Sequence, residues 1–206
     1  MLRSPYLLGI AVFVLLLASV STFLYFEQAR LVEATFPDPE QQTRVFGIID
    51  VIVQSLAILS QLFLTGRIAR RFGVGVLLVA VPVIAAAGFV WLAFAPTFAV
   101  LAVVMVVRRA GEYAFVRPGR EMLYTVVPPQ AKYKAKNFND TAVYRGADAV
   151  SGWAKAGIDA VSQQPLVAML VGAGIAVAWG VTGGGLARAQ RRRERTEAAT
   201  TVPAAG

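Results

Sequence analysis

The stretch VGVLLVAVPVIAAAGFVWLAF, residues 74–94, decides the fold class of this chain because it holds 21 consecutive positions without a charge. A helix needs about 20 apolar residues to cross the hydrocarbon core of a bilayer. Two runs of similar length, residues 6–26 and 45–64, carry one charge between them, at Asp50. A fourth run, residues 165–187, is free of charge. The sequence therefore predicts an all-α, polytopic membrane protein.

Two more polar segments have the length of a membrane span. Residues 98–116 carry three charges near one end, and residues 141–161 carry four charged side chains. Charged residues occur in spans mainly where they face one another or a water-filled cavity. We therefore count six spans; the alternative for residues 141–161 is an amphipathic helix lying in the membrane interface. Residues 188–206 are expected to form a basic and then disordered cytoplasmic tail.

Composition excludes several classes of protein. Of 206 residues, 57% are apolar and 16% are charged, whereas an ordinary soluble domain has about a quarter charged residues. The chain lacks Cys and His, which excludes disulfides, thiolate metal sites and His-dependent catalytic triads. The net charge of +8 is confined to short segments between apolar runs, unlike that of a nucleic-acid-binding protein. We expect no enzyme activity, no metal and no cofactor.

The basic residues predict the orientation in the membrane. Cytoplasmic loops of membrane proteins are enriched in Lys and Arg. With the N-terminus inside, 16 of the 20 basic residues fall in cytoplasmic segments. Both termini are therefore predicted to be cytoplasmic. We also expect an integral protein of a bacterial inner (plasma) membrane, with the lipid bilayer as a partner.

A stripe of charges in residues 141–161 is the main candidate for a substrate pathway. Arg145, Asp148, Lys155 and Asp159 recur at helical spacing and share one face with Gly152, and Tyr144 lies beside them. One interpretation is a cavity for a small charged solute, which could be an anion. The other is a set of internal ion pairs, Arg145 with Asp148 and Lys155 with Asp159, that holds the bundle together.

Asp50 and Gln54 lie four residues apart in the second span and are expected to face that stripe. Asp50 could be a gate or a proton-linked carboxylate, or a solvated acid at the end of a helix.

A cytoplasmic gate or anion-attracting surface is the second candidate site. For Glu112, one turn beyond two arginines, a salt bridge is the default interpretation. The residues of this predicted site are Arg108, Arg109, Glu112, Arg70, Arg71, Lys132, Lys134 and Lys136.

Six helices with a basic loop after the second resemble one repeat half of the major facilitator superfamily, in which two such halves enclose a central solute site. Residues 66–73, GRIARRFG, are similar to the superfamily's Gly-x-x-x-Asp-Arg-x-Gly loop, with Arg70 where the acid is usual.

A closer resemblance covers residues 113–145. Tyr113-Ala114-Phe115, Pro118 with Arg120-Glu121-Met122, residues 132–136 (KYKAK), and Asp140 with Arg145 are similar to the nucleotide (ATP/ADP) transporter family of bacteria and plastids. That family typically has a basic residue three positions after the arginine, and this chain has Asp148. An acid there would repel phosphate, which favours a related transporter over ATP/ADP exchange.

The resemblance implies the second, C-terminal half of a secondary transporter that works by alternating access. Such a half needs its missing N-terminal half or a second copy of itself. The alternatives are a non-transporting membrane scaffold or regulatory subunit and a nonfunctional truncated transporter.

Overall fold

A computed structural model describes residues 4–162 and 164–201, without the side chains of residues 159, 161 and 197–201. The described chain is helical and contains no strand. Its elements are α1 (Pro5–Thr35), α2 (Pro39–Ser60), η1 (Gln61–Thr65), α3 (Gly66–Phe72), α4 (Val74–Phe94), α5 (Phe98–Gly111), η2 (Glu112–Val116), α6 (Arg117–Leu123), α7 (Pro129–Phe138), η3 (Asn139–Val143), α8 (Tyr144–Val161) and α9 (Pro165–Thr201).

Four helical stretches are long and apolar enough to cross a membrane: Pro5–Thr35, Pro39–Phe72, Val74–Phe94 and Pro165–Thr196. They contain four of the six predicted spans, which confirms an all-α protein with several apolar helices. The predicted spans 98–116 and 141–161 are helical but more polar. Each belongs to a longer helical stretch that reaches Leu123 in the first case and begins at Pro129 in the second.

Prolines and a glycine set the sharp turns between the helices. The first helix ends where Phe36 and Pro37 follow, and α2 begins at Pro39 with the Asp38 carboxylate accepting a hydrogen bond from the Glu40 amide at 3.1 Å. Gly73 joins α3 to α4 with φ of 75°, a left-handed conformation that favours glycine. These turns fold the helices back on one another.

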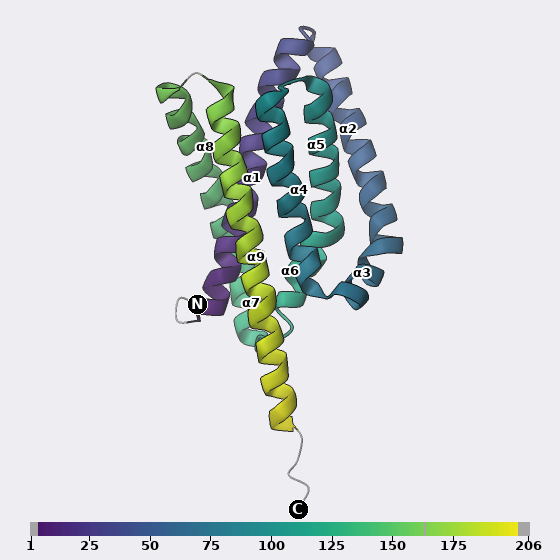
Figure 1. Cartoon of the computed structure of the whole chain (residues 1–206), viewed down its shortest axis with the longest axis vertical. Helices are drawn as coiled ribbons and strands as arrows, with labels where there is room; N and C mark the ends of the chain where they lie inside the picture. The colour runs from purple at the N-terminus through teal and green to yellow at the C-terminus, as the bar shows by residue number, and fades with distance from the viewer. Residues whose placement is uncertain (1–3, 163, 202–206) are drawn as a thin grey trace, which may run out of the picture.

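Small residues bring α4 and α9 together along their length (Figure 1). A Cβ at Gly183 would lie 2.8 Å from the carbonyl oxygen of Leu78, and one at Gly172 would lie 2.5 Å from the ring of Phe89. Trp179 of α9 packs on Phe13 of α1, with ring centroids 5.6 Å apart. Close approach through small residues is a general way to pack helices in a membrane.

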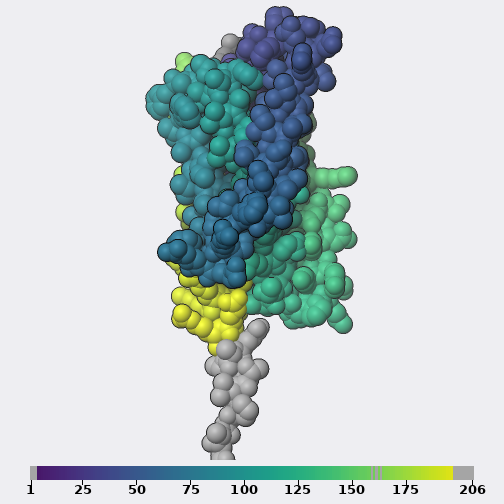
Figure 2. All heavy atoms as spheres, turned by 90° about the vertical axis from the view of Figure 1, so that its right-hand side faces the viewer, coloured from purple at the N-terminus to yellow at the C-terminus, as the bar shows by residue number. Residues whose placement is uncertain are grey.

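Three π-helical turns interrupt the longer helices, and two of them are joined. In η1, Gln61 Nε2 donates a hydrogen bond to the Tyr113 carbonyl of η2 at 2.8 Å. The Thr65 hydroxyl donates to the Ala114 carbonyl at 2.7 Å. These side chains tie α2 to the α5–α6 stretch. In Figure 2, α2 (blue) runs across the face turned toward the viewer, and residues of the α7–α8 region (green) lie beside its lower part.

The segment predicted to be a basic and then disordered tail, residues 188–206, begins as a helix. Helix α9 continues to Thr201, and residues 202–206 lie outside the described part. Gln190 donates to the Met122 carbonyl and to Glu194 one turn later, both at 3.0 Å. The Arg193 guanidinium lies 4.3 Å from the centroid of the Tyr6 ring. These contacts hold the first part of the basic segment against the helical bundle, and the segment remains helical there.

Candidate functional site

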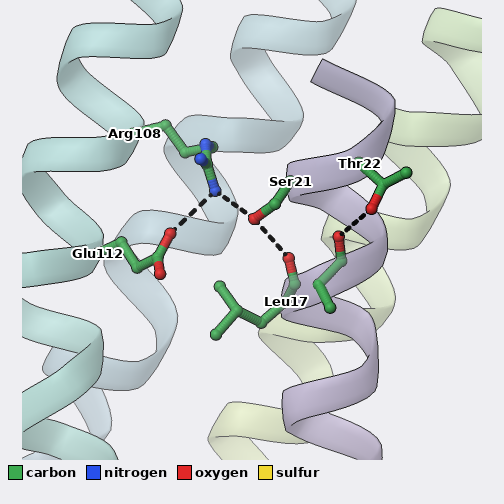
Figure 3. Close-up of polar contacts among 6 residues, drawn as sticks. Leu17, Ser21, Thr22, Arg108 and Glu112 are labelled. Atoms are coloured by element: carbon green, nitrogen blue, oxygen red, sulfur yellow. Dashed lines mark hydrogen bonds and ion pairs between the residues drawn. The ribbon is translucent and has the colours of Figure 1, made fainter. Parts of the chain in front are cut away.

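A buried ion pair on the α5–η2 stretch faces helix α1. Arg108 Nη1 is 3.1 Å from a carboxylate oxygen of Glu112, and both side chains are buried. The residues are one helical turn apart, so α5 and its π-helical continuation η2 position both. The same nitrogen donates to Ser21 Oγ at 2.9 Å, and the Ser21 hydroxyl donates to the Leu17 carbonyl at 3.0 Å (Figure 3). Desolvated ion pairs need such additional hydrogen bonds to offset their desolvation cost.

A cavity of about 630 Å³ lies on one side of this network, and we name it the Asp148 cavity. Helices α1, α2, α5 and α8 all contribute to it. It is lined by Ser21, Thr22, Tyr25, Phe26, Gln28, Phe46, Asp50, Met105, Arg108, Arg109 and Asp148.

A second ion pair crosses the Asp148 cavity from α5 to α2. Arg109 Nη1 lies 2.5 Å from Asp50 Oδ1, and the two side chains are more exposed than those of Arg108 and Glu112. Asp50 is therefore a cavity residue with a partner. The sequence could not decide between this arrangement and a solvated acid at a helix end.

The side chain of Asp148 contacts helix α1 and does not pair with Arg145, its predicted partner one turn away on α8. The Thr22 hydroxyl lies 2.9 Å from Asp148 Oδ1 and 3.0 Å from the Ala18 carbonyl. One hydroxyl proton can serve only one of these acceptors at a time. Next to this contact, the buried Ser151 hydroxyl donates to Ser19 Oγ at 2.7 Å. These contacts join α8 to α1.

A cavity of about 420 Å³, the Asp140 cavity, lies on the other side of the Arg108 network. Within it, Arg120 Nη2 is 3.1 Å from Asp140 Oδ1. Its lining residues are Leu17, Glu112, Val116, Arg117, Arg120, Asp140 and Tyr144. Ser21 and Arg108 line the Asp148 cavity, while Leu17 and Glu112, one turn away from them on the same two stretches, line the Asp140 cavity. The network therefore separates the two spaces.

The structure brings only part of the predicted substrate pathway together. Asp50 and Asp148 share one cavity, whereas Tyr144 lines the other. Gln54 is exposed and lines neither. Arg145 is exposed, and within the described residues its side chain pairs with no acid, so the internal pair with Asp148 does not form. Lys155 is half-buried on α8, and the side chain of Asp159 lies outside the described part.

The predicted cytoplasmic gate separates into three groups. The salt bridge expected at Glu112 forms with Arg108, while Arg109 turns to Asp50. Lys136 lies 2.8 Å from Glu121, which joins α7 to α6. Lys132 and Lys134 lie on the same helix α7, and Arg70 and Arg71 form the third group, exposed on α3.

Sequence reasoning missed the hydroxyl groups of α1 and the aromatic side chains of the Asp148 cavity. Ser21 and Thr22 sit inside an apolar run, where a hydroxyl can satisfy itself on the carbonyl four residues earlier. Their adjacency within a predicted span was the available signal. Nothing in the sequence brought Phe46 of α2 to Tyr25 and Phe26 of α1.

Comparison of the chain with protein families, curated proteins and solved structures finds no match. Among the described residues, no group of three or more His, Cys, Asp or Glu side chains could hold a metal ion. The two cavities and the ion-pair network between them are thus the features on which a function can be argued.

Proposed function

We propose that this chain is a secondary active transporter, or its C-terminal half, that moves a small charged solute across a membrane by alternating access. The observation that carries the proposal is the placement of two cavities with charged residues in their linings on opposite sides of the Arg108–Glu112–Ser21 network. In this scheme the network is the inner gate, closed here so that the Asp148 cavity opens to one side only, and the far end of that cavity closes when the inner gate opens.

The energetics of charge in a membrane support this interpretation. Each charge in a membrane span costs several kcal/mol unless it is paired or solvated, on the order of 3 kcal/mol even on lenient scales. Arg108, Arg109, Asp50 and Asp148 all border one water-accessible space, at the surface of helices that otherwise present apolar side chains. A pathway for a charged solute would explain why these costly charges are present, whereas the stability of the bundle does not need them.

The gate can open without separating a buried charge from its partner. Arg108 and Glu112 belong to the same helical stretch, so their ion pair moves as a unit with α5. The contact that crosses from α5 to α1 is the hydrogen bond from Arg108 to Ser21. Hydrogen bonds to charged groups contribute about 1.5–3 kcal/mol, a barrier that a conformational change can overcome.

The membrane arrangement is part of the proposal. We propose six spans, with α5 and α8 added to the four apolar stretches, and both termini on the cytoplasmic side of a bacterial inner membrane; the distribution of basic residues favours this orientation. The Asp148 cavity then faces outward and the Asp140 cavity faces inward. A missing N-terminal half or a second copy is proposed as the partner that covers the charged cavities, while exposed apolar side chains such as Val51 of α2 and Trp153 of α8 fit contact with lipid as well as with such a partner.

Single cysteines test the proposal without knowledge of the solute, because the chain contains no native cysteine. Thr22→Cys, in the Asp148 cavity beside the gate, is labelled in membrane vesicles with an impermeant thiol reagent from either side. Alternating access predicts labelling from both sides. Thr43→Cys and Thr196→Cys are the controls, expected to react only from outside and only from inside. Labelling of Thr22→Cys from a single side would favour a non-transporting scaffold.

A further inference from the structure

The unpaired charge of the Asp148 cavity is negative. Its two arginines are each neutralised by an acid, Arg108 by Glu112 and Arg109 by Asp50. Asp148 completes the charged lining, and among the described residues it takes part in no ion pair. Its hydrogen-bond partner is the neutral hydroxyl of Thr22. The lining together with Glu112 therefore carries one more negative than positive formal charge.

Other basic groups on α8 do not supply the missing counter-charge at this carboxylate. Arg145 precedes Asp148 by one turn, is exposed and is not part of the cavity lining. Lys155 lies two turns beyond Asp148, has an interaction of its own and also lies outside the lining. The carboxylate is thus open to a positive group that enters the cavity.

Aromatic rings line the same cavity. Tyr25 and Phe26 of α1 have exposed fractions of 64% and 40%, and Phe46 of α2 belongs to the same lining. Tyr25 and Phe26 meet edge to face, with centroids 6.2 Å apart. The faces of aromatic rings attract cations, at exposed sites as well as at buried ones. Met105 adds a polarizable side chain to the lining.

We propose that the Asp148 cavity binds an organic cation, an ammonium or guanidinium group carried on an apolar body. Asp148 would receive the charge, and Tyr25, Phe26 and Phe46 would hold the apolar body. The inference deepens the proposed function, on which it rests for the transport step but not for binding. Under this inference the predicted small charged solute is a cation. Arg108 and Arg109 are then not receptors for an anion, because each already pairs with an acid.

Binding of two oppositely charged probes tests the inference. The full chain in lipid nanodiscs is titrated with benzyltrimethylammonium and with phenylmethanesulfonate, which are similar in size, and empty nanodiscs provide the baseline. The ammonium ion is expected to bind and the sulfonate is not. Asp148→Asn should weaken ammonium binding about tenfold or more, the loss expected when a charge partner is replaced by an amide.

Asp38→Asn is the matched control, since it makes the same chemical change at an exposed acid outside both cavities, where asparagine can also cap helix α2. It should alter ammonium binding less than twofold, and circular dichroism checks that both variants keep their helices. Equal affinity of wild type and Asp148→Asn, or preferential binding of the sulfonate, would overturn the inference. Cysteine labelling separates the two proposals: absent ammonium binding with two-sided labelling of Thr22→Cys refutes the cation site alone, and ammonium binding with one-sided labelling refutes transport alone.

Discussion

Arg108 and Glu112 form a buried ion pair within one helical stretch, 3.1 Å apart, and Arg108 also binds Ser21 of the facing helix α1. The side chains of the pair are only 6% and 10% exposed. The intrahelical pair keeps the charges together, and the single bond to Ser21 connects two helices. In the proposed gate, the Arg108–Glu112 ion pair therefore contributes to stability, and the bond from Arg108 to Ser21 is the contact that opens.

Breaking the ion pair should cost more than removing it. Glu112→Gln leaves the Arg108 guanidinium buried without a counter-charge and should lower the free energy of unfolding by about 3–5 kcal/mol. The double variant Arg108→Gln with Glu112→Gln should recover most of that loss. Denaturant unfolding in one detergent measures both. A double variant that is less stable than Glu112→Gln would contradict the assignment.

Two glycines of α9 offer a matched test of its packing on α4. Gly183→Ala puts a methyl group 2.8 Å from the Leu78 carbonyl and should destabilise the protein by about 1–3 kcal/mol. Gly185→Ala meets nothing within 4 Å and should be neutral or stabilising, because alanine favours a helix by about 1 kcal/mol over glycine. Thermal unfolding compares the two variants; equal melting temperatures would show that α4 and α9 do not pack in this way.

Tyr124, between α6 and α7, should make stability depend on alkaline pH. Burial raises the pKa of Tyr124 above its ordinary value of about 10, so the fold favours the neutral phenol. This contribution is complete below pH 10 and is lost as the pH rises from there toward the raised pKa. Tyr124→Phe should remove the part of the loss of stability at alkaline pH that comes from ionisation of Tyr124. Unfolding measured between about pH 8 and about pH 12, on both sides of the ordinary tyrosine pKa of about 10, checks this.

Tyr124→Phe also removes the hydroxyl that accepts a hydrogen bond from Asn139 Nδ2 at 2.9 Å. The variant should therefore be less stable at neutral pH by about 1–3 kcal/mol, since Asn139 is buried. Identical pH profiles for the wild type and the variant would contradict the role of Tyr124.

The six-span topology predicts the side on which each turn is exposed. Cysteines at Thr97, between α4 and α5, and at Ser162, between α8 and α9, should react with impermeant reagents from outside. A cysteine at Thr125, between α6 and α7, should react from inside. If Thr97→Cys and Thr125→Cys react from the same side, α5 does not cross the membrane.

The sequence was sufficient for the helices but only partly for the site. Long apolar runs specify helices because burial in lipid requires internal hydrogen bonds, and the spacing of Arg108 and Glu112 predicts their pair. The contact of Thr22 with Asp148 joins residues 126 positions apart, and no local pattern encodes it. Helical spacing alone also failed for Gln54. A step of four residues rotates a side chain about 40° around the helix, and Gln54 does not line the cavity that Asp50 lines.

The most direct measurement of the central claim is the effect of Ser21→Ala on two-sided labelling of Thr22→Cys. Removing the Ser21 hydroxyl deletes the bond from Arg108 to α1 and leaves the Arg108–Glu112 pair intact. An alternating-access gate predicts that labelling becomes faster from inside and slower from outside, because the population shifts toward the inward-open state. Unchanged rates, or faster labelling from both sides, would contradict the account.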